Sequence, residues 1–491
     1  MSIQKVLIAN RGEIAVRIIK TLQRLGIESV IVYHAVDAKT PAVQMADKKV
    51  ELLGDLPVSA YLDMEQIIQA CKDMDADAVH PGFGFLSENA EFATRVADND
   101  IIFIGPSAEV INLMGNKVRA RSFCIEHGFS IAPSVVDEGD DKAFISRAEE
   151  IGVPLLIKAA AGGGGKGMQI VRDPAKLEES IALARGEALR SFGDSLVYAE
   201  RFVDSPRHIE VQILADKHGN VLHLNERECS IQRRFQKVIE EAPSATLTPE
   251  QREEICNTAV AIAAKAGYEN AGTVEFIYAP NGEFYFLEMN TRIQVEHPIT
   301  EMITGVDLVE EQIKVAEGQH LSHKQSDIPL NGHAIEVRLY AEDADNDFTP
   351  ATGPLLKYQL PEDLARIENG FFEGQLVSSA FDPMLSKIIV HGQNREEATE
   401  KMIEALKQST VLGVTSNRDF LIRALGHAAY KNGDTHTGFI AEHAESLKRP
   451  VLQEEQLKLL LGLAAMSNRD FNDTTVQPQE PHITIGNWRY L

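Results

Sequence analysis

The chain has 491 residues, of which 44% are hydrophobic and 25% charged, and a formal net charge of −25 at pH 7. This acidic excess excludes a nucleic-acid polymer as the main ligand, although a few lysines and arginines in a cleft can still attract a small anion. No apolar run reaches the roughly 18 residues of a membrane span, and four scattered cysteines with no visible secretory signal favour a reduced, cytoplasmic protein.

The first 130 residues alternate strand-like and helical patterns. Strands are predicted at KVLIAN, ESVIVYH and IIFIGP, and a helix over residues 11–26. Such alternation predicts a parallel sheet covered by helices, which binds ligands at the carboxyl ends of its strands, where HPGFGFLSEN and IGPS fall. Only Gly12 occupies the first strand-to-helix turn, so the dinucleotide fingerprint is missing and the fold alone does not imply NAD.

From about Gly152 the pattern changes to short strands typical of an antiparallel sheet. They are predicted at VPLLIKAAA, DSLVYAERFV, RHIEVQILAD and VLHLNERE. A third strand-rich region runs from GHAIEVRLYAE to SAFDPMLSKIIVHG, followed by a helix at REEATEKMIEALKQS. Near the C-terminus, LKLLLGLAAM predicts a packed amphipathic helix, SNRDFNDTTVQPQEPH a linker and ITIGNWRYL a strand.

A glycine loop at residues 162–167 joins two of these strands and ends in Lys166 and Gly167. Glycines let backbone N–H groups approach phosphate oxygens closely, so the loop is a candidate phosphate cradle. It differs from a Walker A motif, which needs Ser or Thr after the lysine. A flexible hairpin tip without a ligand is the alternative. Lys158, a charge within the apolar strand before the loop, is the stronger candidate.

The run GTVEFIYAPNGEFYFLEMNTRIQVEHP carries the strongest functional signal. Asn281-Gly282 predicts a hairpin, and counting outward from a two-residue turn places Glu275 directly opposite Glu288. Like charges that face each other cost stability. A divalent cation between them removes that cost, and Mg²⁺ favours one or two carboxylates together with substrate phosphates.

Polar residues then continue at every second position and alternate with Met289, Ile293 and Val295. In an extended strand the polar side chains would project from one side: Glu288, Asn290, Arg292, Gln294 and Glu296. A solvated outer face is the alternative, although Asn, Arg and Gln are unusual choices for it. Metal-binding acids followed by anion-binding donors predict a nucleotide–Mg²⁺ site beside a site for a small anion.

Two basic segments allow two interpretations each. RECSIQRRFQK places Arg233, Arg234 and Lys237 around an aromatic residue, as either a phosphate-contacting loop or a basic surface turn. Arg338 shares a strand face with Glu336, so it is either a functional cation or half of a structural ion pair.

Together these segments resemble the biotin carboxylase members of the ATP-grasp superfamily over residues 3 to about 446. EMNTRIQVEHPITE is highly specific for that family, whereas the glycine loop is shared more loosely among ATP-grasp enzymes. The resemblance implies a multidomain α/β and α+β fold. Its parts would be a Rossmann-like N-terminal domain (1–130), a mobile ATP-grasp lid (131–204), the ATP-grasp core with the biotin carboxylase C-terminal domain (205–446), and a helix and linker resembling the start of a linking domain (447–491).

The resemblance also implies roles for individual residues. Mg²⁺ or Mn²⁺ would be bound by Glu275, Glu288 and Asn290, and Arg338 would face biotin. Bicarbonate would be held by Lys237, Arg292, Gln294, Val295 and Glu296. The catalytic set would be Lys237, Arg292, Glu296 and Arg338. ATP would contact Lys117, Lys158, Gly163, Gly164, Gly165, Lys166, Gly167, Met168, Glu200, Phe202, Val203, His208, Gln232, Phe235 and Ile277.

The chemistry that the resemblance implies proceeds through carboxyphosphate. Glu296 would take a proton from bicarbonate, which attacks the γ-phosphate of ATP. Carboxyphosphate then yields CO₂ and phosphate, the phosphate deprotonates biotin N1, and Arg338 stabilises the enolate-like oxygen. The expected partners are a biotin carboxyl carrier protein or domain, a carboxyltransferase subunit and a second copy of the chain, but neither nucleic acid nor a membrane. An acyl-CoA is the expected final acceptor, ahead of pyruvate or urea.

Two departures from the family pattern bear on function. Phe235 occupies a position where many relatives have His or Asn, and it cannot donate a hydrogen bond to the nucleotide. No AMKM-like biotin-attachment lysine is present, so the carrier is expected outside this stretch of chain. Residues 447–491 resemble the opening of the linking domain in the longer α subunits of acyl-CoA carboxylases.

Two other functions stand as alternatives. Another ATP-grasp ligase, such as a carbamoyl-phosphate or purine-pathway carboxylase relative, would have little use for Arg338. An inactive scaffold subunit would not need the acidic and basic site residues, all of which are present.

Overall fold

In the computed structural model the chain divides into two compact units, residues 1–447 and 448–491. The structure describes residues 2–159, 168–192, 195–451 and 453–467. Most of the predicted linker and the predicted strand ITIGNWRYL lie outside these residues. So do five of the predicted nucleotide contacts: Gly163, Gly164, Gly165, Lys166 and Gly167.

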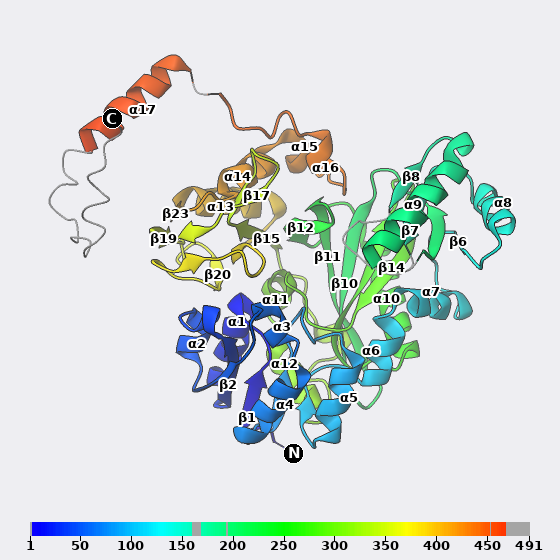
Figure 1. Ribbon diagram of the computed structural model, residues 1–491, viewed down its shortest axis with the longest axis horizontal. Helices are drawn as coiled ribbons and strands as arrows, with labels where there is room; N and C mark the ends of the chain where they lie inside the picture. Colours follow the sequence, from blue (N-terminus) through cyan, green and yellow to red (C-terminus); the bar gives the residue numbers. More distant parts are fainter. Residues whose placement is uncertain (1, 160–167, 193–194, 452, 468–491) are drawn as a thin grey trace. The chain divides into compact units, whose positions relative to one another are not determined.

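A five-stranded parallel sheet begins the first unit, as the alternating pattern predicts. Its order is β3-β2-β1-β4-β5. Val6 and Ile8 face one hydrophobic core and Leu7 faces another, because helices cover both faces (Figure 1). The strands are β1 (Lys5–Ile8), β2 (Glu28–His34), β3 (Lys48–Leu52), β4 (Ala78–His80) and β5 (Ile102–Phe103). The helices are α1 (Gly12–Leu25), η1 (Ala35–Asp37), α2 (Pro41–Met45), α3 (Pro57–Tyr61), α4 (Met64–Asp73), α5 (Ala90–Asp98), α6 (Ala108–Met114) and α7 (Lys117–Glu126).

A four-stranded antiparallel sheet follows, in the order β6-β9-β7-β8. The glycine loop connects β7 to β8, which pair as a hairpin. The buried residues of this sheet and its helices, such as Phe144 and Ile157, form a hydrophobic core of their own. The elements are β6 (Ser134–Val136), α8 (Asp141–Ile151), β7 (Leu155–Ala159), β8 (Gln169–Val171), η2 (Pro174–Lys176), α9 (Leu177–Phe192) and β9 (Val197–Arg201).

An eight-stranded antiparallel sheet, β14-β13-β10-β11-β12-β15-β22-β20, completes the first unit. Pairing of β12 with β15 joins the second and third strand-rich regions of the sequence into this one sheet. The strands are β10 (Arg207–Ala215), β11 (Val221–Arg233), β12 (Gln236–Ala242), β13 (Asn270–Tyr278), β14 (Phe284–Asn290), β15 (His333–Tyr340), β20 (Arg366–Asn369) and β22 (Met384–Gly392).

Helices and short strand pairs surround this sheet (Figure 1). The predicted helix at REEATEKMIEALKQS is confirmed as α13. The helices are α10 (Pro249–Lys265), α11 (His297–Thr304), α12 (Leu308–Ala316), η3 (Gln325–Asp327), α13 (Arg395–Gln408), α14 (Arg418–Gly426), α15 (Ala428–Lys431) and α16 (Phe439–Glu442). The short strands are β16 (Glu342–Asp343), β17 (Thr349–Pro350), β18 (Gly353–Pro354), β19 (Lys357–Gln359), β21 (Leu376–Val377) and β23 (Thr410–Leu412).

The second unit contains α17 (Glu454–Ser467), which includes the run LKLLLGLAAM. The predicted helix is therefore present, and its packing stays a prediction. Its leucines are exposed, from 46% for Leu457 to 65% for Leu459. Apolar spacing predicts a helix well but does not reveal whether a neighbouring element covers it. None of the described helices is long and apolar enough to cross a membrane.

Candidate active site

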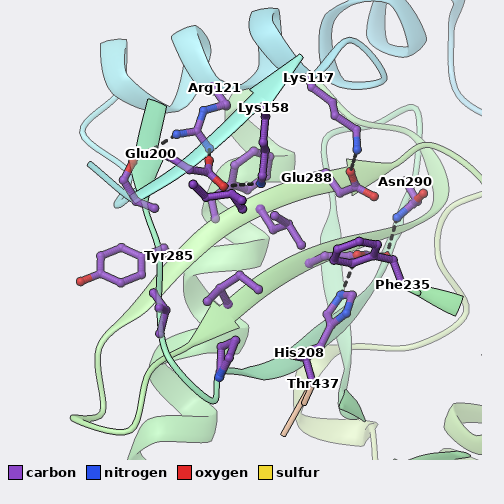
Figure 2. Close-up of a pocket in the computed structure, with 18 of the residues that line it drawn as sticks. Lys117, Arg121, Lys158, Glu200, His208, Phe235, Tyr285, Glu288, Asn290 and Thr437 are labelled. Carbon is purple, nitrogen blue, oxygen red and sulfur yellow. Dashed lines mark hydrogen bonds and ion pairs between the residues drawn. The ribbon is translucent and has the colours of Figure 1, made fainter. Parts of the chain in front are cut away.

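A cavity of about 700 Å³ lies between the four-stranded and the eight-stranded sheets. Its lining includes eight lysines and arginines against four glutamates, although the whole chain is strongly acidic. This local excess of positive charge suits an anionic ligand such as a nucleotide or bicarbonate. Figure 2 shows side chains of both sheets pointing into the cavity.

The cavity gathers nearly every residue that the sequence nominates for a site. The nominated nucleotide contacts that line it are Lys117, Lys158, Met168, Glu200, Phe202, Val203, His208, Gln232, Phe235 and Ile277. The nominated metal, bicarbonate and biotin residues that line it are Lys237, Glu275, Glu288, Asn290, Arg292, Gln294, Val295, Glu296 and Arg338. Residues more than 200 positions apart therefore meet in one place, while the five residues of the glycine loop remain outside the described structure.

Lys158, the charge within an apolar strand, faces the cavity from β7 and forms an ion pair with Glu200 of β9. The second oxygen of Glu200 lies 3.4 Å from Nη1 of Arg121, so one carboxylate holds two cations (Figure 2). Tyr198 packs beside them, and burial raises the pKa of its hydroxyl to about 12. Two cations on the cavity wall could bind phosphate oxygens, with Glu200 holding them in position.

The hairpin count is confirmed, because Glu275 of β13 pairs directly with Glu288 of β14. The turn is not the two-residue turn that the count assumed. Ala279 and Glu283 close a three-residue loop, in which Gly282 adopts a φ of +89°. A bulge between the Phe276–Phe286 and Glu275–Glu288 pairs then restores the predicted register.

Each of these two carboxylates faces cations in the cavity. Glu288 lies 2.6 Å from Nζ of Lys117, and Glu275 accepts a 2.7 Å hydrogen bond from His208. Burial raises the pKa of Glu275, but Lys237 and His208 outweigh that effect and hold the pKa well below its usual range. Asn290 donates a 2.6 Å hydrogen bond from its amide nitrogen to Glu275. With the amide turned to present its oxygen, Asn290 and the two carboxylates would be a donor set that fits Mg²⁺ or Mn²⁺.

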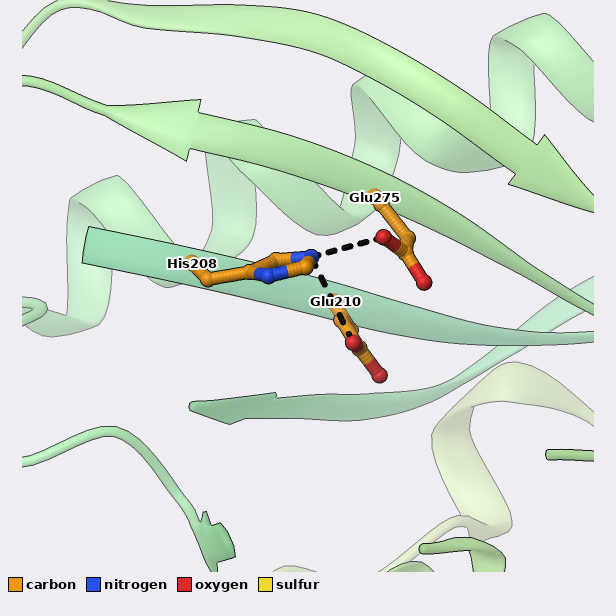
Figure 3. Close-up of side chains that lie close together, drawn as sticks. All are labelled: His208, Glu210 and Glu275. Atoms are coloured by element: carbon orange, nitrogen blue, oxygen red, sulfur yellow. Dashed lines mark hydrogen bonds and ion pairs between the residues drawn. The ribbon is translucent and has the colours of Figure 1, made fainter. Parts of the chain in front are cut away.

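Glu210 is a site residue that the sequence analysis missed. It lies on β10 beside His208 and Glu275, and ligand atoms of these three residues lie within 4.8 Å of one another (Figure 3). Glu210 also forms ion pairs with Lys237 and the fully buried Arg227. A signal was present in the sequence, since polar residues alternate with Ile and Val along RHIEVQILAD as they do after Glu288.

The predicted continuation of the strand beyond Glu288 is wrong in its secondary structure. β14 ends at Asn290, and Glu296 is already the N-cap residue of α11. The side chains nevertheless reach the same cavity, because the connecting segment runs along its wall. Arg292 is held there by Glu88 at 2.9 Å, and Gln294 donates a 2.6 Å hydrogen bond to Glu275.

Glu296 lies between two cations at the inner end of the cavity. Its carboxylate accepts hydrogen bonds from Lys237 at 2.6 Å and from Arg338 at 3.0 Å. Burial raises the pKa of Glu296, but Lys237 and Arg338 outweigh it and hold the pKa well below its usual range. An ionised carboxylate between two cations can accept a proton from a bound acid.

Arg338 does form an ion pair, but the partner is not the strand neighbour Glu336. Its Nε donates to Glu240 at 2.6 Å, and its second contact is Glu296. Burial raises the pKa of Glu240 to about 7, against the lowering effect of Arg338. Glu240, on β12, is a second residue that the sequence analysis missed. Arg338 is thus held by acids while it lines the cavity.

The QRRFQK segment forms a tight hairpin between β11 and β12. Arg234 and Phe235 occupy its tip with φ of 48° and 67°, and both line the cavity. Arg234 forms an ion pair with Asp347, while Arg233 stacks on the ring of Phe348 at 4.3 Å. The tip therefore borders the cavity, and Phe235 is 62% exposed.

The two antiparallel sheets enclose a positively charged cavity beside a pair of carboxylates, and this arrangement is that of an ATP-grasp enzyme. In this chain an N-terminal domain with a parallel sheet precedes it. Residues 2–111 match the biotin carboxylase N-terminal domain, 116–324 the ATP-binding domain of the carbamoyl-phosphate synthase large chain, and 336–442 the biotin carboxylase C-terminal domain. The chain belongs to the biotin carboxylase family.

The chain is similar to α subunits of acyl-CoA carboxylases. It is 46% identical to the mitochondrial methylcrotonoyl-CoA carboxylase subunit alpha of Mus musculus, over 94% of this chain and 65% of that protein. It is also 46% identical to the mitochondrial propionyl-CoA carboxylase alpha chain of Homo sapiens, over 94% of this chain and 64% of that protein. The chain therefore spans a little under two thirds of the length of these relatives.

Solved structures share the fold of the first unit. The biotin carboxylase domain dimer of Hydrogenobacter thermophilus 2-oxoglutarate carboxylase, in complex with MgADP, ADP and bicarbonate, gives a TM-score of 0.87 at 41% identity, covering 92% of this chain and all of that one. The Campylobacter jejuni biotin carboxylase–β-γ-ATP complex gives 0.86 at 40% identity, covering 90% and 99%. The fold class expected from the sequence is thus confirmed.

Proposed function

We propose that this chain carboxylates biotin on a carrier protein, using ATP and bicarbonate, as the first half-reaction of a biotin-dependent carboxylase. The single observation that carries the proposal is the position of Glu296. Its carboxylate lies between Lys237 and Arg338, in the cavity that also holds the Glu275–Glu288 pair. A proton acceptor, two cations and a pair of metal-binding acids therefore share one cavity.

In the proposed reaction Lys237, Arg292 and Gln294 bind bicarbonate, and Glu296 accepts its proton. The bicarbonate oxygen then attacks the γ-phosphorus of ATP, which releases ADP and forms carboxyphosphate. Decomposition of carboxyphosphate gives CO₂ and phosphate, and the phosphate takes the N1 proton of biotin while Arg338 stabilises the oxygen on which negative charge develops. The deprotonated N1 then attacks CO₂, which gives carboxybiotin. A metal ion bound by Glu275, Glu288 and Asn290 would neutralise phosphate charge.

The nucleotide would lie between the two antiparallel sheets, along the contacts nominated from the sequence. We propose that residues 131–204 act as a lid over it, followed by a core at 205–446. The separate hydrophobic core of the four-stranded sheet supports this division. Closing such a lid would exclude water from carboxyphosphate.

The rest of the reaction would be performed by partners. We propose that biotin arrives on a carrier protein or domain and that a carboxyltransferase subunit passes the carboxyl group to an acyl-CoA, because the similar relatives are acyl-CoA carboxylase α subunits. A homodimer is supported by the dimer of the similar Hydrogenobacter domain. The four cysteines are free and buried, which supports a reducing compartment, and we propose the cytoplasm even though the relatives named above are mitochondrial.

The test measures ADP release with Mg²⁺, ATP, bicarbonate and free biotin. We expect release to require both bicarbonate and biotin. Glu296→Ala should reduce the coupled rate by about 100-fold or more, the usual scale for a general base, while ATP still binds. The exposed Glu362→Ala is the control and should leave the rate unchanged. Biotin-independent turnover would favour another ATP-grasp ligase, and no turnover would favour an inactive scaffold subunit.

A further inference from the structure

Lys387 of β22 is a lysine with no exposed side-chain surface, outside the residues nominated for the reaction. Its ammonium group donates a 2.6 Å hydrogen bond to the backbone carbonyl oxygen of Val295. The carboxylate of Glu13, in the first turn of α1, lies 3.1 Å from the same ammonium group. A buried lysine therefore connects the N-terminal domain, the C-terminal sheet and the segment proposed to bind bicarbonate.

The sheet register places Lys387 beside the biotin-facing arginine. Lys387 pairs with Arg338 of β15 on one side and with Glu368 of β20 on the other. Directly paired residues project from the same face of a sheet, so these three side chains form a row. Lys387 thus lies on the face that carries Arg338, next to the segment 292–296.

Val295 links Gln294 and Glu296, two of the three polar residues that this segment presents to the cavity. The carbonyl oxygen of Val295 and the amide nitrogen of Glu296 belong to one rigid peptide plane. A bond to that oxygen therefore fixes the backbone from which the Glu296 side chain extends. Glu296 is then held at three points: its carboxylate by Lys237 and Arg338, and its preceding peptide by Lys387.

The contact with Val295 is the tighter of the two contacts made by the ammonium group. Burial raises the pKa of Glu13, whose two carboxylate oxygens have no hydrogen-bond partner among the described residues. A buried ion pair contributes little net stability compared with apolar residues of similar volume. Stability alone therefore gives a weak reason for an ammonium group here, whereas a donor aimed at the Val295 carbonyl gives a specific one.

We propose that Lys387 is a positioning residue for bicarbonate: through the Val295 carbonyl it orients the peptide from which Glu296 extends. The proposal rests on the proposed function, because it assigns bicarbonate to the segment 292–296. Lys387 touches neither substrate and acts through that segment alone. The nucleotide contacts on the four-stranded sheet lie on other elements, so they should not depend on Lys387.

The test separates the two substrates kinetically, using the ADP-release assay on the full chain. Lys387→Met keeps the length and volume of the side chain but removes the donor. We expect the KM for bicarbonate to rise about 10- to 100-fold, the scale of a small misplacement of reacting groups, with the KM for MgATP within twofold of the wild type. Ile388→Ala is the matched control, because Ile388 points into the hydrophobic core on the opposite face of β22. It should lower the melting temperature and leave both KM values unchanged.

A second variant covers the case in which Lys387→Met does not fold. Lys387→Gln replaces the ammonium group with an uncharged amide on a side chain that is one bond shorter. The same rise in the bicarbonate KM is expected. An unchanged bicarbonate KM in a folded variant, or equal rises for bicarbonate and MgATP, would overturn the positioning role while leaving the proposed function intact. A wild-type chain without bicarbonate-dependent ADP release would overturn both.

Discussion

At the scale of single residues, the sequence located the acids of the hairpin but not all the acids that hold the cations of the site. Glu275 and Glu288 could be paired by counting from Asn281-Gly282, because strand register depends on local turn chemistry. Glu210 and Glu240 were missed, although Glu210 has the polar residues His208 and Gln212 two positions away on its strand. Only the pairing of distant strands shows that these acids meet Lys237 and Arg338.

Phe235 gives a prediction about nucleotide binding. Its φ of 67° lies in the left-handed region, which His adopts more readily than Phe, and its side chain lines the cavity. Phe235→His should relieve that strain and add a donor to the nucleotide. We expect the KM for MgATP to fall about threefold to tenfold, the scale of one hydrogen bond, with kcat within twofold. Steady-state kinetics against MgATP measures this.

The control for this substitution is Phe372→His, at a half-exposed phenylalanine outside the cavity lining. It should leave both constants unchanged. Equal changes of KM and kcat in Phe235→His would contradict a role limited to nucleotide binding.

At the scale of elements, the strands and helices were predictable wherever the apolar period was regular. The segment after β14 was not, because the alternation of polar residues persists through a stretch of bends and a turn that pairs with no strand. The hairpin turn was also misjudged, yet the three-residue loop and the bulge compensate for each other. The polar residues after β14 still reach the cavity, as does Val295 from an intervening position, so the period-2 pattern named site residues without fixing which side chains share a face.

Glu241 connects three elements and gives a prediction about acid stability. On β12, it accepts hydrogen bonds from His333 of β15 at 2.9 Å and from Arg395 of α13 at 2.6 Å. Burial raises the pKa of Glu241, but His333 and Arg395 outweigh it and lower the pKa to about 2. The carboxylate therefore stabilises the fold fully above its unfolded pKa near 4.5, and this contribution is lost as pH falls toward 2.

Glu241→Gln should lower the free energy of unfolding by about 3 kcal/mol at pH 7, because it leaves Arg395 without its charge partner. Denaturant unfolding at a series of pH values measures the difference from the wild type. That difference should stay constant down to about pH 5 and shrink below it, since only the wild type loses the carboxylate charge. Exposed Glu254→Gln is the control and should show no difference. A difference that grows on acidification would contradict this account.

At the scale of the whole molecule, composition argued against a nucleic-acid polymer and left a small anionic ligand open, but it did not predict where such a ligand binds. The acidic chain concentrates eight lysines and arginines around one cavity, and this arrangement comes from tertiary contacts between distant segments. The parallel and antiparallel regions could be told apart from the sequence. That two strand-rich regions join through the pairing of β12 with β15 could not be predicted from it. Apolar spacing predicted the C-terminal helix α17 correctly, but such spacing does not identify a surface that packs against the helix.

The exposed helix α17 leads to a prediction about which part of the chain the site requires. Among the described residues, every site residue and every hydrophobic core residue lies within residues 1–447, and Leu447, 3% exposed, is the last residue of those cores. Truncation after Pro450 leaves all of these residues in place, so it should keep the melting temperature within about 2 °C and keep ADP release unchanged. Truncation after Glu442 is the control: it also removes Leu447 and the carbonyl bonded by Arg423, and should lower the melting temperature clearly. Differential scanning calorimetry of both variants decides the matter, because a large loss in the longer variant would mean that α17 packs against the first unit.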